Sequence, residues 1–421
     1  MFIYFFLIRI AALLGHEKAR KLVKGQAATL RRAEREWSAL RGAIWIHAAS
    51  VGEFEQARPI IEKLRAEKPQ RKIVITFFSP SGYEMRKNYD LADAVLYLPF
   101  ATRRNVKRFI EALQPSMALF VKYEFWPAYL RELKKRKIRT YSISAIFRPK
   151  QLFFRPWGKT QLRLLNCFTH IFVQDTESEN LLKAHGINHC SVAGDTRFDR
   201  VKEIMELQKT KADNRLTPVA QFVQGCDRVI IAGSTWPKDE QLLEQYMSQL
   251  QCQMANGQAK LILVPHEIDE VHLHFIFKLF QGRMVRYSYV VNNTELTPES
   301  RQNILYHAQV LLIDTMGLLS SLYQFGQVAY VGGGFGVGIH NTIEAAVYGL
   351  PVIFGPNYLH FREAIGLIEA GAARSIKNYQ ELEQALNTAL DQHAFIGAKA
   401  SAYVESELGA TSKIYREIFE K

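Results

Sequence analysis

Two series of short apolar runs, separated by longer amphipathic segments, make up the hydrophobic pattern of the chain. The first series covers residues 43–47, 72–77, 94–98, 117–121, 139–143 and 170–173. Each run has the length and the continuous apolarity of a strand that is buried on both faces, and helical patterns such as 53–68 and 105–113 lie between the runs. This alternation predicts a parallel sheet that helices cover on both sides.

The strand pattern stops over residues 202–222 and then resumes. The later runs cover 228–232, 259–264, 284–287, 310–313, 328–331 and 351–354. Because 421 residues are too many for one ordinary core, we predict an α/β protein with two Rossmann-like domains that face a cleft. The expected divisions are a helix over 1–25, the two domains over 26–215 and 216–400, and a C-terminal helix over 401–421.

The first fifteen residues, MFIYFFLIRIAALLG, are apolar except for Arg9. As one helix they would be about 22 Å long, against about 30 Å for a bilayer core, and they lack the early charge and the cleavage site of a signal peptide. Helical spacing puts Arg9, His16, Arg20 and Lys24 on one face. The pattern favours a short membrane-associating helix with a basic flank, and a buried first helix is the alternative.

Charge is divided unequally along the chain. Residues 1–200 hold 36 Lys and Arg against 18 Asp and Glu, a balance of +18, whereas residues 201–421 have a balance of −5. The segments 103–108 and 131–139 carry much of the excess, most of it on what we expect to be solvated helix faces. The imbalance predicts an anionic partner for the first half, which is nucleic acid, a phosphorylated substrate or a membrane surface.

Composition excludes several classes of protein. An aromatic content of 12% and the lack of low-complexity tracts exclude a disordered, collagen-like or coiled-coil protein. Four cysteines, at positions 167, 190, 226 and 252, form no CxxC pair and lie far apart. Neither a disulfide framework nor a zinc site is therefore predicted, and a reducing compartment fits best.

The strongest chemical signal follows the run at 328–331, where five glycines occupy positions 332, 333, 334, 336 and 338. His340 and Asn341 then open a helix expected over 343–348, with Glu344 placed to hold a ribose or a base. Glycines let a backbone approach a ligand, and the N–H groups at a helix start favour a phosphate. The loop lacks GK[ST], so we predict a phosphate cradle other than a Walker loop; a tight turn is the alternative.

Three other strand ends in the second half have ligand-binding potential, because open parallel sheets bind ligands at the carboxyl ends of their strands. Pro265 and His266 follow one run, and residues 314–317, with Gly317 for close backbone contact, follow another. A surface turn is the alternative for both. Ser234 and Thr235 either cap the helix that begins near residue 237 or contact the ligand.

In the first half, small residues that include Ser50 and Gly52 clear space where the run at 43–47 ends. Glu53 then lies in the first turn of a helix, where the helix dipole is expected to keep the carboxylate ionised, as a general base requires. An ordinary capping Glu is the alternative.

Lys122, Glu124 and Trp126 follow the run at 117–121, and Arg148 follows the segment 142–147. Glu124 among aromatic residues is suited to binding a sugar or a cation, or to a structural salt bridge.

Taken together, these residues resemble the Kdo transferases, which move 3-deoxy-D-manno-octulosonic acid (Kdo) from CMP-Kdo onto the lipid A precursor. The resemblance covers nearly the whole chain, as a series of blocks in one order. The blocks are HAASVGE (47–53), YEFWP (123–127), AGDTRFD (193–199), AGSTW (232–236), VPH (264–266), DTMG (314–317) and GIHNTIEAA (338–346).

The resemblance implies the two-domain glycosyltransferase B architecture and inversion at the anomeric carbon, with neither a bound metal nor a cofactor. It implies that Glu53 is the catalytic base and that Glu124 is a second essential carboxylate near the acceptor. The expected acceptor-binding residues are Ser50, Gly52, Lys122 and Arg148. The implied donor-binding residues are Ser234, Thr235, Pro265, His266, Met316, Gly317, Leu318, Gly338, Ile339, His340, Asn341 and Glu344. Two departures concern single contacts: Ile339 stands where many relatives have Gly, and Leu318 stands where Glu is commoner.

The partners expected from the resemblance are CMP-Kdo, a phosphorylated glycolipid and the cytoplasmic face of the inner membrane. Two rival functions remain open at this stage. One is another glycosyltransferase B enzyme or a nucleotide-sugar epimerase. The other is a non-catalytic binder of nucleic acid or anionic lipid. This function would explain the charge balance of +18 in the first half but not the glycine-rich second half. We expect no nucleic-acid partner.

Overall fold

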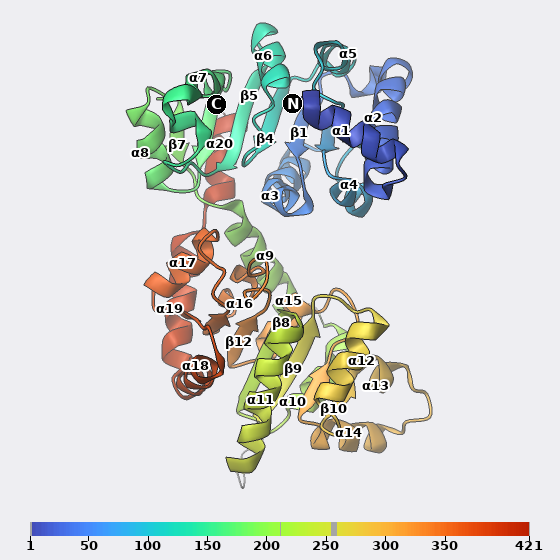
Figure 1. The fold of residues 1–421 in the computed structure, drawn as a ribbon, viewed down its shortest axis with the longest axis vertical. Helices are drawn as coiled ribbons and strands as arrows, with labels where there is room; N and C mark the ends of the chain where they lie inside the picture. Colours follow the sequence, from blue (N-terminus) through green and yellow to red (C-terminus); the bar gives the residue numbers. More distant parts are fainter. Residues whose placement is uncertain (1, 211, 254–258, 421) are drawn as a thin grey trace. The chain divides into compact units, whose positions relative to one another are not determined.

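The computed structural model describes residues 2–210, 212–253 and 259–420 and divides the chain into two compact units (Figure 1). Unit 1 contains residues 1–200 and 407–421, and unit 2 contains residues 201–406. The division falls inside helix α9 (Thr196–Thr210), ahead of the boundary expected near residue 215. Adding 407–421, which has three basic and three acidic residues, leaves unit 1 with its balance of +18.

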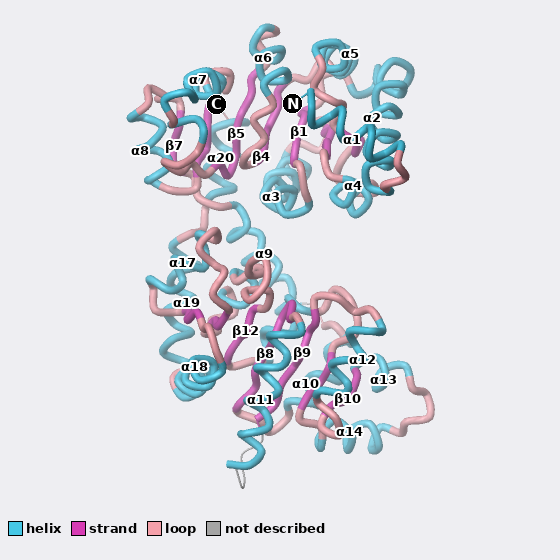
Figure 2. Tube along the Cα trace, in the orientation of Figure 1, coloured by secondary structure: helices cyan, strands magenta, loops and turns pink. Residues whose placement is uncertain are grey.

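Unit 1 is built on a sheet of seven parallel strands in the order β3-β2-β1-β4-β5-β6-β7. Figure 2 colours the strands magenta. The strands of this sheet are β1 (Ile44–Ala48), β2 (Ile73–Phe77), β3 (Ala94–Tyr97), β4 (Met117–Val121), β5 (Arg139–Ala145), β6 (His170–Val173) and β7 (Cys190–Val192). The six expected runs all form strands, whereas the short edge strand β7 was not predicted.

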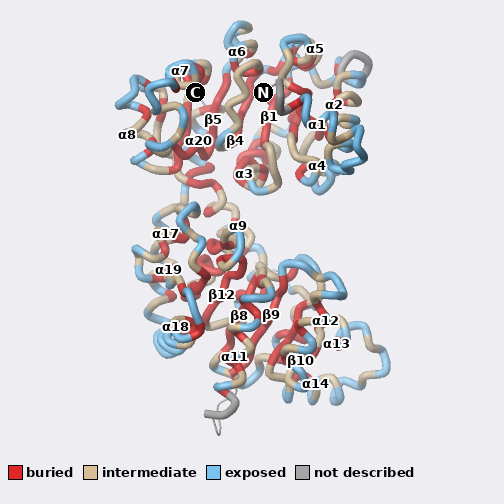
Figure 3. The backbone as a smooth tube through the Cα atoms, viewed as in Figure 1, coloured by how far each residue is buried: buried red, intermediate tan, exposed pale blue. Residues whose placement is uncertain are grey.

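Helices cover both faces of this sheet, and the strands are its most deeply buried part (Figure 3). The helices are α1 (Phe2–Leu13), α2 (Glu17–Glu36), α3 (Val51–Glu67), α4 (Pro80–Arg86), α5 (Arg103–Leu113), α6 (Pro127–Lys135), α7 (Lys159–Leu165), α8 (Thr176–Ala184) and α20 (Ala410–Phe419). Ile44 and Ile46 pack with α3 and α20, while Trp45 packs on the other side with α5 and α6. This is the alternation that a strand buried on both faces requires.

Unit 2 contains a second sheet of seven parallel strands, in the order β10-β11-β9-β8-β12-β13-β14. Its strands are β8 (Arg228–Thr235), β9 (Ala259–Pro265), β10 (Met284–Arg286), β11 (Val310–Leu312), β12 (Val328–Val331), β13 (Val352–Phe354) and β14 (Ala373–Ser375). Its helices are α10 (Thr217–Val223), α11 (Pro237–Gln253), α12 (Glu270–Leu279), α13 (Tyr287–Asn292), α14 (Pro298–His307), α15 (Leu319–Leu322), α16 (Ile343–Ala346), α17 (Arg362–Glu369), α18 (Tyr379–Asp391) and α19 (His393–Ser406).

The N-terminal segment is two helices, so the prediction of one helix over 1–25 with a single basic face is wrong. Gly15 has a φ of +89°, and the His16 side chain accepts the Ala19 N–H to begin α2. This left-handed turn breaks the helix between Arg9 and Arg20. On α1, Phe5 packs against Phe100 at 4.5 Å between ring centroids. Among the described residues, no helix is long and apolar enough to cross a membrane.

The C-terminal segment also differs from expectation, because 401–421 holds parts of two helices that belong to different units. Helix α19 ends unit 2, and α20 packs into the core of unit 1 through Ile414 and Ile418. The Asp199 carboxylate accepts the N–H groups of Gly409 at 2.6 Å and Thr411 at 2.7 Å, which ties the start of α20 to unit 1.

Candidate active site

The candidate site of unit 1 lies where the strand order of its sheet reverses. From β1 the chain proceeds to β2 and β3 on one side and then returns to β4 on the other, so the carboxyl ends of β1 and β4 are neighbours. Open α/β sheets bind ligands at such a switch point. Glu53 follows β1 and Glu124 follows β4, so the sheet brings the two predicted carboxylates to one place.

Glu53 is both a helix-capping residue and a carboxyl group with an unusual pKa. Ser50 is the N-cap of α3, and Glu53 Oε2 accepts the Ala49 N–H at 2.6 Å. Burial, and secondly the charge of Glu124, raise the pKa of Glu53 from 4.5 to about 7. This pKa departs from the expectation of a fully ionised group, because desolvation and the charge of Glu124 outweigh the hydrogen bond from Ala49. A carboxyl group that titrates near neutrality is suited to proton transfer.

His47 holds Glu124 and is the residue that our site prediction missed. Its ring is fully buried, with Nδ1 3.0 Å from the Thr76 carbonyl oxygen and Nε2 2.9 Å from Glu124 Oε2. Nδ1 also lies 2.9 Å from the Thr76 hydroxyl. Because a carboxylate only accepts, the proton between His47 and Glu124 is donated by Nε2. The Trp126 indole N–H donates to the same Oε2. The available signal was a polar residue inside an otherwise apolar strand.

The four residues assigned to the acceptor follow β1, β4 and β5, which are adjacent in the sheet. The Ser50 hydroxyl accepts the Glu53 N–H at 3.4 Å, and Gly52 is exposed with open space beside it. Lys122 has a φ of +56° and its Nζ lies 5.6 Å from the Tyr123 ring centroid. Arg148 is half-buried just after β5.

Unit 2 has its own switch point, between β8 and β12, and three aromatic side chains stack beside it. The ring centroids of Trp236 and His266 are 5.0 Å apart, and those of His266 and His340 are 4.3 Å apart. The Trp236 indole N–H donates to His340 Nε2 at 3.3 Å. Burial, and secondly the neighbouring His266, lower the pKa of His340 to about 4, so its imidazole is neutral at physiological pH.

The glycine-rich loop is shaped by packing between main chains. A Cβ on Gly332 would lie 2.3 Å from the Ser234 carbonyl oxygen, and one on Gly334 would lie 2.6 Å from Gly355. Many loop amides are already bonded: Gly333 N–H donates to Asp239, and His340 N–H donates to the Gly332 carbonyl. The glycines at 332 and 334 thus serve close packing, as in the tight-turn alternative.

The helix after this loop is shorter than expected, because α16 covers only Ile343–Ala346. One turn provides few aligned peptide dipoles. Asn341 accepts the Ile343 N–H through Oδ1 and donates to Glu344 through Nδ2 at 2.9 Å. We therefore discard the dipole of this helix as the main source of phosphate stabilisation.

Two buried carboxylates at the start of α11 hold the neighbouring loops. Asp239 accepts hydrogen bonds from the N–H groups of Trp236 and Gly333, each at 3.0 Å. Glu240 accepts the Thr235 hydroxyl at 2.9 Å and lies 2.9 Å from His272 Nε2. Thr235 is fully buried and bonded in this way, so its hydroxyl neither caps α11 nor faces a ligand.

The other predicted donor residues differ in what they expose. The side chains of Leu318 and Ile339 are buried, so only their main chains are available to a ligand. Met316 is 74% exposed and Gly317 has a φ of +83°. Pro265 ends β9, and His266 after it is exposed. Ser234 and Gly338 have φ angles of +55° and +152°, so the main chain turns sharply at both.

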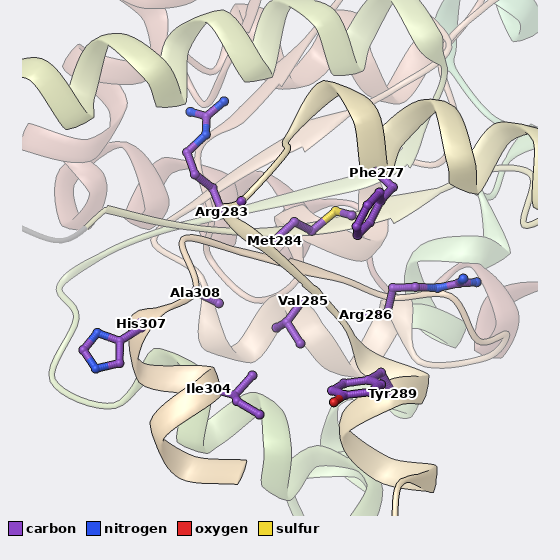
Figure 4. Close-up of a pocket in the computed structure, with 10 residues that line it drawn as sticks. Phe277, Arg283, Met284, Val285, Arg286, Tyr289, Ile304, His307 and Ala308 are labelled. Carbon is purple, nitrogen blue, oxygen red and sulfur yellow. The ribbon is translucent and has the colours of Figure 1, made fainter. Parts of the chain in front are cut away.

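A pocket of about 500 Å³ lies elsewhere in unit 2, beside the edge strand β10 (Figure 4). Phe277, Met284, Tyr289 and Ile304 line it, and it includes none of the predicted site residues. Among the described residues, no three His, Cys, Asp or Glu side chains gather as a metal site. Three of the four cysteines, at positions 167, 190 and 226, are free thiols; the side chain of the fourth, at 252, lies outside the described residues.

Comparisons with known proteins agree with the fold and the motifs. A sequence model of the family described as 3-Deoxy-D-manno-octulosonic-acid transferase (kdotransferase) matches residues 18–200. A 3-deoxy-D-manno-octulosonic acid transferase of Aquifex aeolicus is 28% identical over 81% of this chain and 84% of its own length. One of Rickettsia bellii is 24% identical over 92% of this chain and 88% of its own length.

Solved structures resemble the fold. The UDP-GlcNAc 2-epimerase from Neisseria meningitidis bound to UDP-GlcNAc has a TM-score of 0.63 at 16% identity, over 90% of this chain and 100% of that protein. The epimerase from Methanocaldococcus jannaschii has a TM-score of 0.55 at 15% identity, over 86% of this chain and 98% of that one. Two Rossmann-like units with parallel sheets define the chain as a protein of the glycosyltransferase B architecture.

Within that class, the resemblance drawn from the motifs is confirmed: residues 18–200 match the Kdo transferase family model, and curated Kdo transferases are similar to this chain over 81% and 92% of its length.

The raised pKa of Glu53 predicts a pH-dependent stability difference from Glu53→Gln. Between pH 4.5 and about 7, the folded chain holds a proton on Glu53 that the unfolded chain releases, so this contribution is fully present below pH 4.5 and is lost as the pH rises through about 7. We expect Glu53→Gln to gain up to about 3 kcal/mol relative to the parent chain over this interval. Urea unfolding followed by tryptophan fluorescence measures it, since four of the five tryptophans lie in unit 1. A pH-independent difference would contradict the assigned pKa.

Close packing of the glycine loop predicts opposite results for two similar substitutions. Gly334→Ala places a methyl group 2.6 Å from Gly355 and is expected to cost about 1–3 kcal/mol of stability. Gly336→Ala, whose nearest atom lies 3.5 Å away, is the matched control and should unfold like the parent chain. Thermal unfolding of the full chain distinguishes them, and equal stabilities would remove the packing explanation.

Proposed function

We propose that the chain is an inverting glycosyltransferase that moves Kdo from CMP-Kdo onto lipid IVA, the tetraacyldisaccharide 1,4'-bisphosphate precursor of lipid A, in lipopolysaccharide biosynthesis. The observation that carries the proposal is Glu53, a carboxyl group at a switch point whose pKa lies at about 7. Similarity to the Kdo transferases supports the choice of the transferred sugar.

In the proposed reaction, Glu53 takes the proton of an acceptor hydroxyl while that oxygen attacks the anomeric carbon of Kdo. The bond from this carbon to the phosphate oxygen breaks, and CMP leaves with the bonding electrons. Attack from the face opposite the leaving group inverts the configuration. A positioned general base typically contributes about 10²–10⁴ in rate.

Glu124 is proposed to orient the acceptor. His47 and Trp126 hold its Oε2, whereas Oε1 has no hydrogen bond to any described residue. One oxygen therefore remains for a substrate hydroxyl, on a carboxylate that cannot easily rotate. Ser50, Gly52, Lys122 and Arg148 are proposed to complete the acceptor site.

Unit 2 is proposed to hold CMP-Kdo, through His266, His340 and the loops that carry the other predicted donor residues. Neutral histidines and main-chain N–H groups can bind a phosphate by hydrogen bonding, so we propose that the reaction needs neither a metal nor a cofactor.

The membrane surface is proposed as the place of the reaction, with the protein on its cytoplasmic face. Helix α1 exposes Phe6 and Leu13, and Leu14 follows it; these residues are 64%, 87% and 82% exposed. A pocket of about 260 Å³ between α2 and α4 adds Lys21 and Lys24 to the surface of unit 1. Exposed apolar residues next to cations, on a unit with a charge balance of +18, fit an anionic membrane and a bisphosphorylated lipid.

Replacing Glu53 by Gln is expected to reduce Kdo transfer by at least 10²-fold, about the loss of a general base, while CMP-Kdo binding is unchanged. Transfer by the parent chain should rise with pH through about 7, as Glu53 ionises. Product mass spectrometry and calorimetry with CMP-Kdo measure the two effects. Glu67→Gln, at the far end of the same helix α3, is the control. Normal transfer by Glu53→Gln would exclude Glu53 as the base.

Exhaustive EDTA treatment is expected to leave transfer from CMP-Kdo to lipid IVA undiminished. Release of CMP or UDP from CMP-Kdo and from UDP-sugars, measured in parallel, tests the donor class. UDP release alone would favour another glycosyltransferase or an epimerase. RNA binding without any donor turnover would favour a non-catalytic role, and loss of activity with EDTA would reject metal independence.

A further inference from the structure

A hydrogen bond from Trp236 to His340 determines which imidazole nitrogen carries the proton. The indole N–H of Trp236 lies 3.3 Å from His340 Nε2 and points toward it. An indole nitrogen only donates, so Nε2 must be the unprotonated, accepting nitrogen. The low pKa of His340 means that the ring is neutral, so its single proton is on Nδ1.

The imidazole is held on several sides, which makes this tautomer a fixed feature of the loop. His266 stacks on it at a centroid distance of 4.3 Å. Gly333 lies so close that a Cβ there would be 2.9 Å from His340 Cδ2. The His340 main-chain N–H donates to the Gly332 carbonyl at 3.2 Å. Nδ1 has no hydrogen-bond partner among the described residues, so its N–H remains available to a ligand.

The carboxylate of Asp239 fixes the position of Trp236. Its main-chain N–H donates to Asp239 at 3.0 Å, and the same carboxylate accepts the Gly333 N–H. Asp239 is buried and also accepts the Tyr330 hydroxyl at 2.7 Å. One carboxylate thus holds both the residue that donates to His340 and the glycine against which the ring packs.

We propose that Trp236 is a positioning residue that holds His340 in the Nδ1–H tautomer, so that His340 offers an anionic ligand of unit 2 one neutral hydrogen-bond donor. The identity of that ligand, the phosphate of a nucleoside monophosphate sugar, rests on the proposed function; the tautomer does not. The arrangement binds an anion by a directed N–H group without a buried positive charge, whose desolvation is costly.

The first test is spectroscopic and needs no substrate. The full chain is labelled with ¹⁵N-histidine, and the His340 signals are assigned by their loss in His340→Gln. The parent chain should show an unprotonated Nε2 and a protonated Nδ1 at pH 7. Trp236→Phe keeps a ring for stacking but removes the donor, so His340 should become a mixture of tautomers. Trp157→Phe, at an exposed position in unit 1, is the matched control.

The second test is kinetic. Trp236→Phe should raise the KM for CMP-Kdo about tenfold, which corresponds to 1.4 kcal/mol, and should change kcat less than twofold. Trp236→His restores an N–H donor on a ring and should recover part of the affinity. If Trp236→Phe unfolds, as circular dichroism would show, the parent chain alone still tests the proposal, because a protonated Nε2 on His340 would overturn it.

The outcomes separate the two proposals. An unchanged His340 tautomer in folded Trp236→Phe, or a protonated Nε2 in the parent chain, overturns the role of Trp236. The expected tautomers without CMP-Kdo turnover by the parent chain would reject the proposed function and leave the positioning role standing. A large fall in kcat at unchanged KM would contradict a role in donor binding.

Discussion

Burial of both faces of two parallel sheets is the constraint on which the rest of the structure depends. Apart from His47, the side chains of β1 and β4 are apolar and pack into the cores on the two sides of the sheet. Polar groups are therefore concentrated at strand ends, where the main chain leaves the sheet. Among these ends only those at a switch point leave room between diverging helices. Glu53 and Glu124 in unit 1, and Trp236 and His340 in unit 2, all lie at such ends.

The same burial determines the electrostatic character of the sites. At Glu53, removal from water exceeds the stabilisation that the backbone N–H of Ala49 provides, so the charged form is disfavoured. At His340 the same effect disfavours the cation. Two groups of opposite charge type are thus both driven toward neutrality, and each stays polar enough to exchange or donate a proton. Local sequence pattern does not contain this information, because it depends on what packs around each group.

The sequence was sufficient to predict the positions of most strands and of their ends. All twelve expected runs form strands because their apolar residues have one stable environment, the middle of a covered sheet. The two missed strands, β7 and β14, are edge strands of three residues with mixed burial. The helix break at Gly15 was missed because the spacing of Arg9, His16, Arg20 and Lys24 fits one continuous helix. Neither the hydrogen bond of His47 to Glu124 nor that of Trp236 to His340 could be predicted, since each joins residues at least 77 positions apart.

Helix α20 has a consequence for the order in which the protein can assemble. Its apolar residues complete one face of the first sheet, yet in the sequence they come after the whole of unit 2. Until residues 410–419 leave the ribosome, Ile44 and Ile46 and their neighbours lack part of their cover. Biosynthesis from the N-terminus therefore yields a finished unit 2 before a finished unit 1, and a fragment that stops at residue 200 lacks a piece of its own interior.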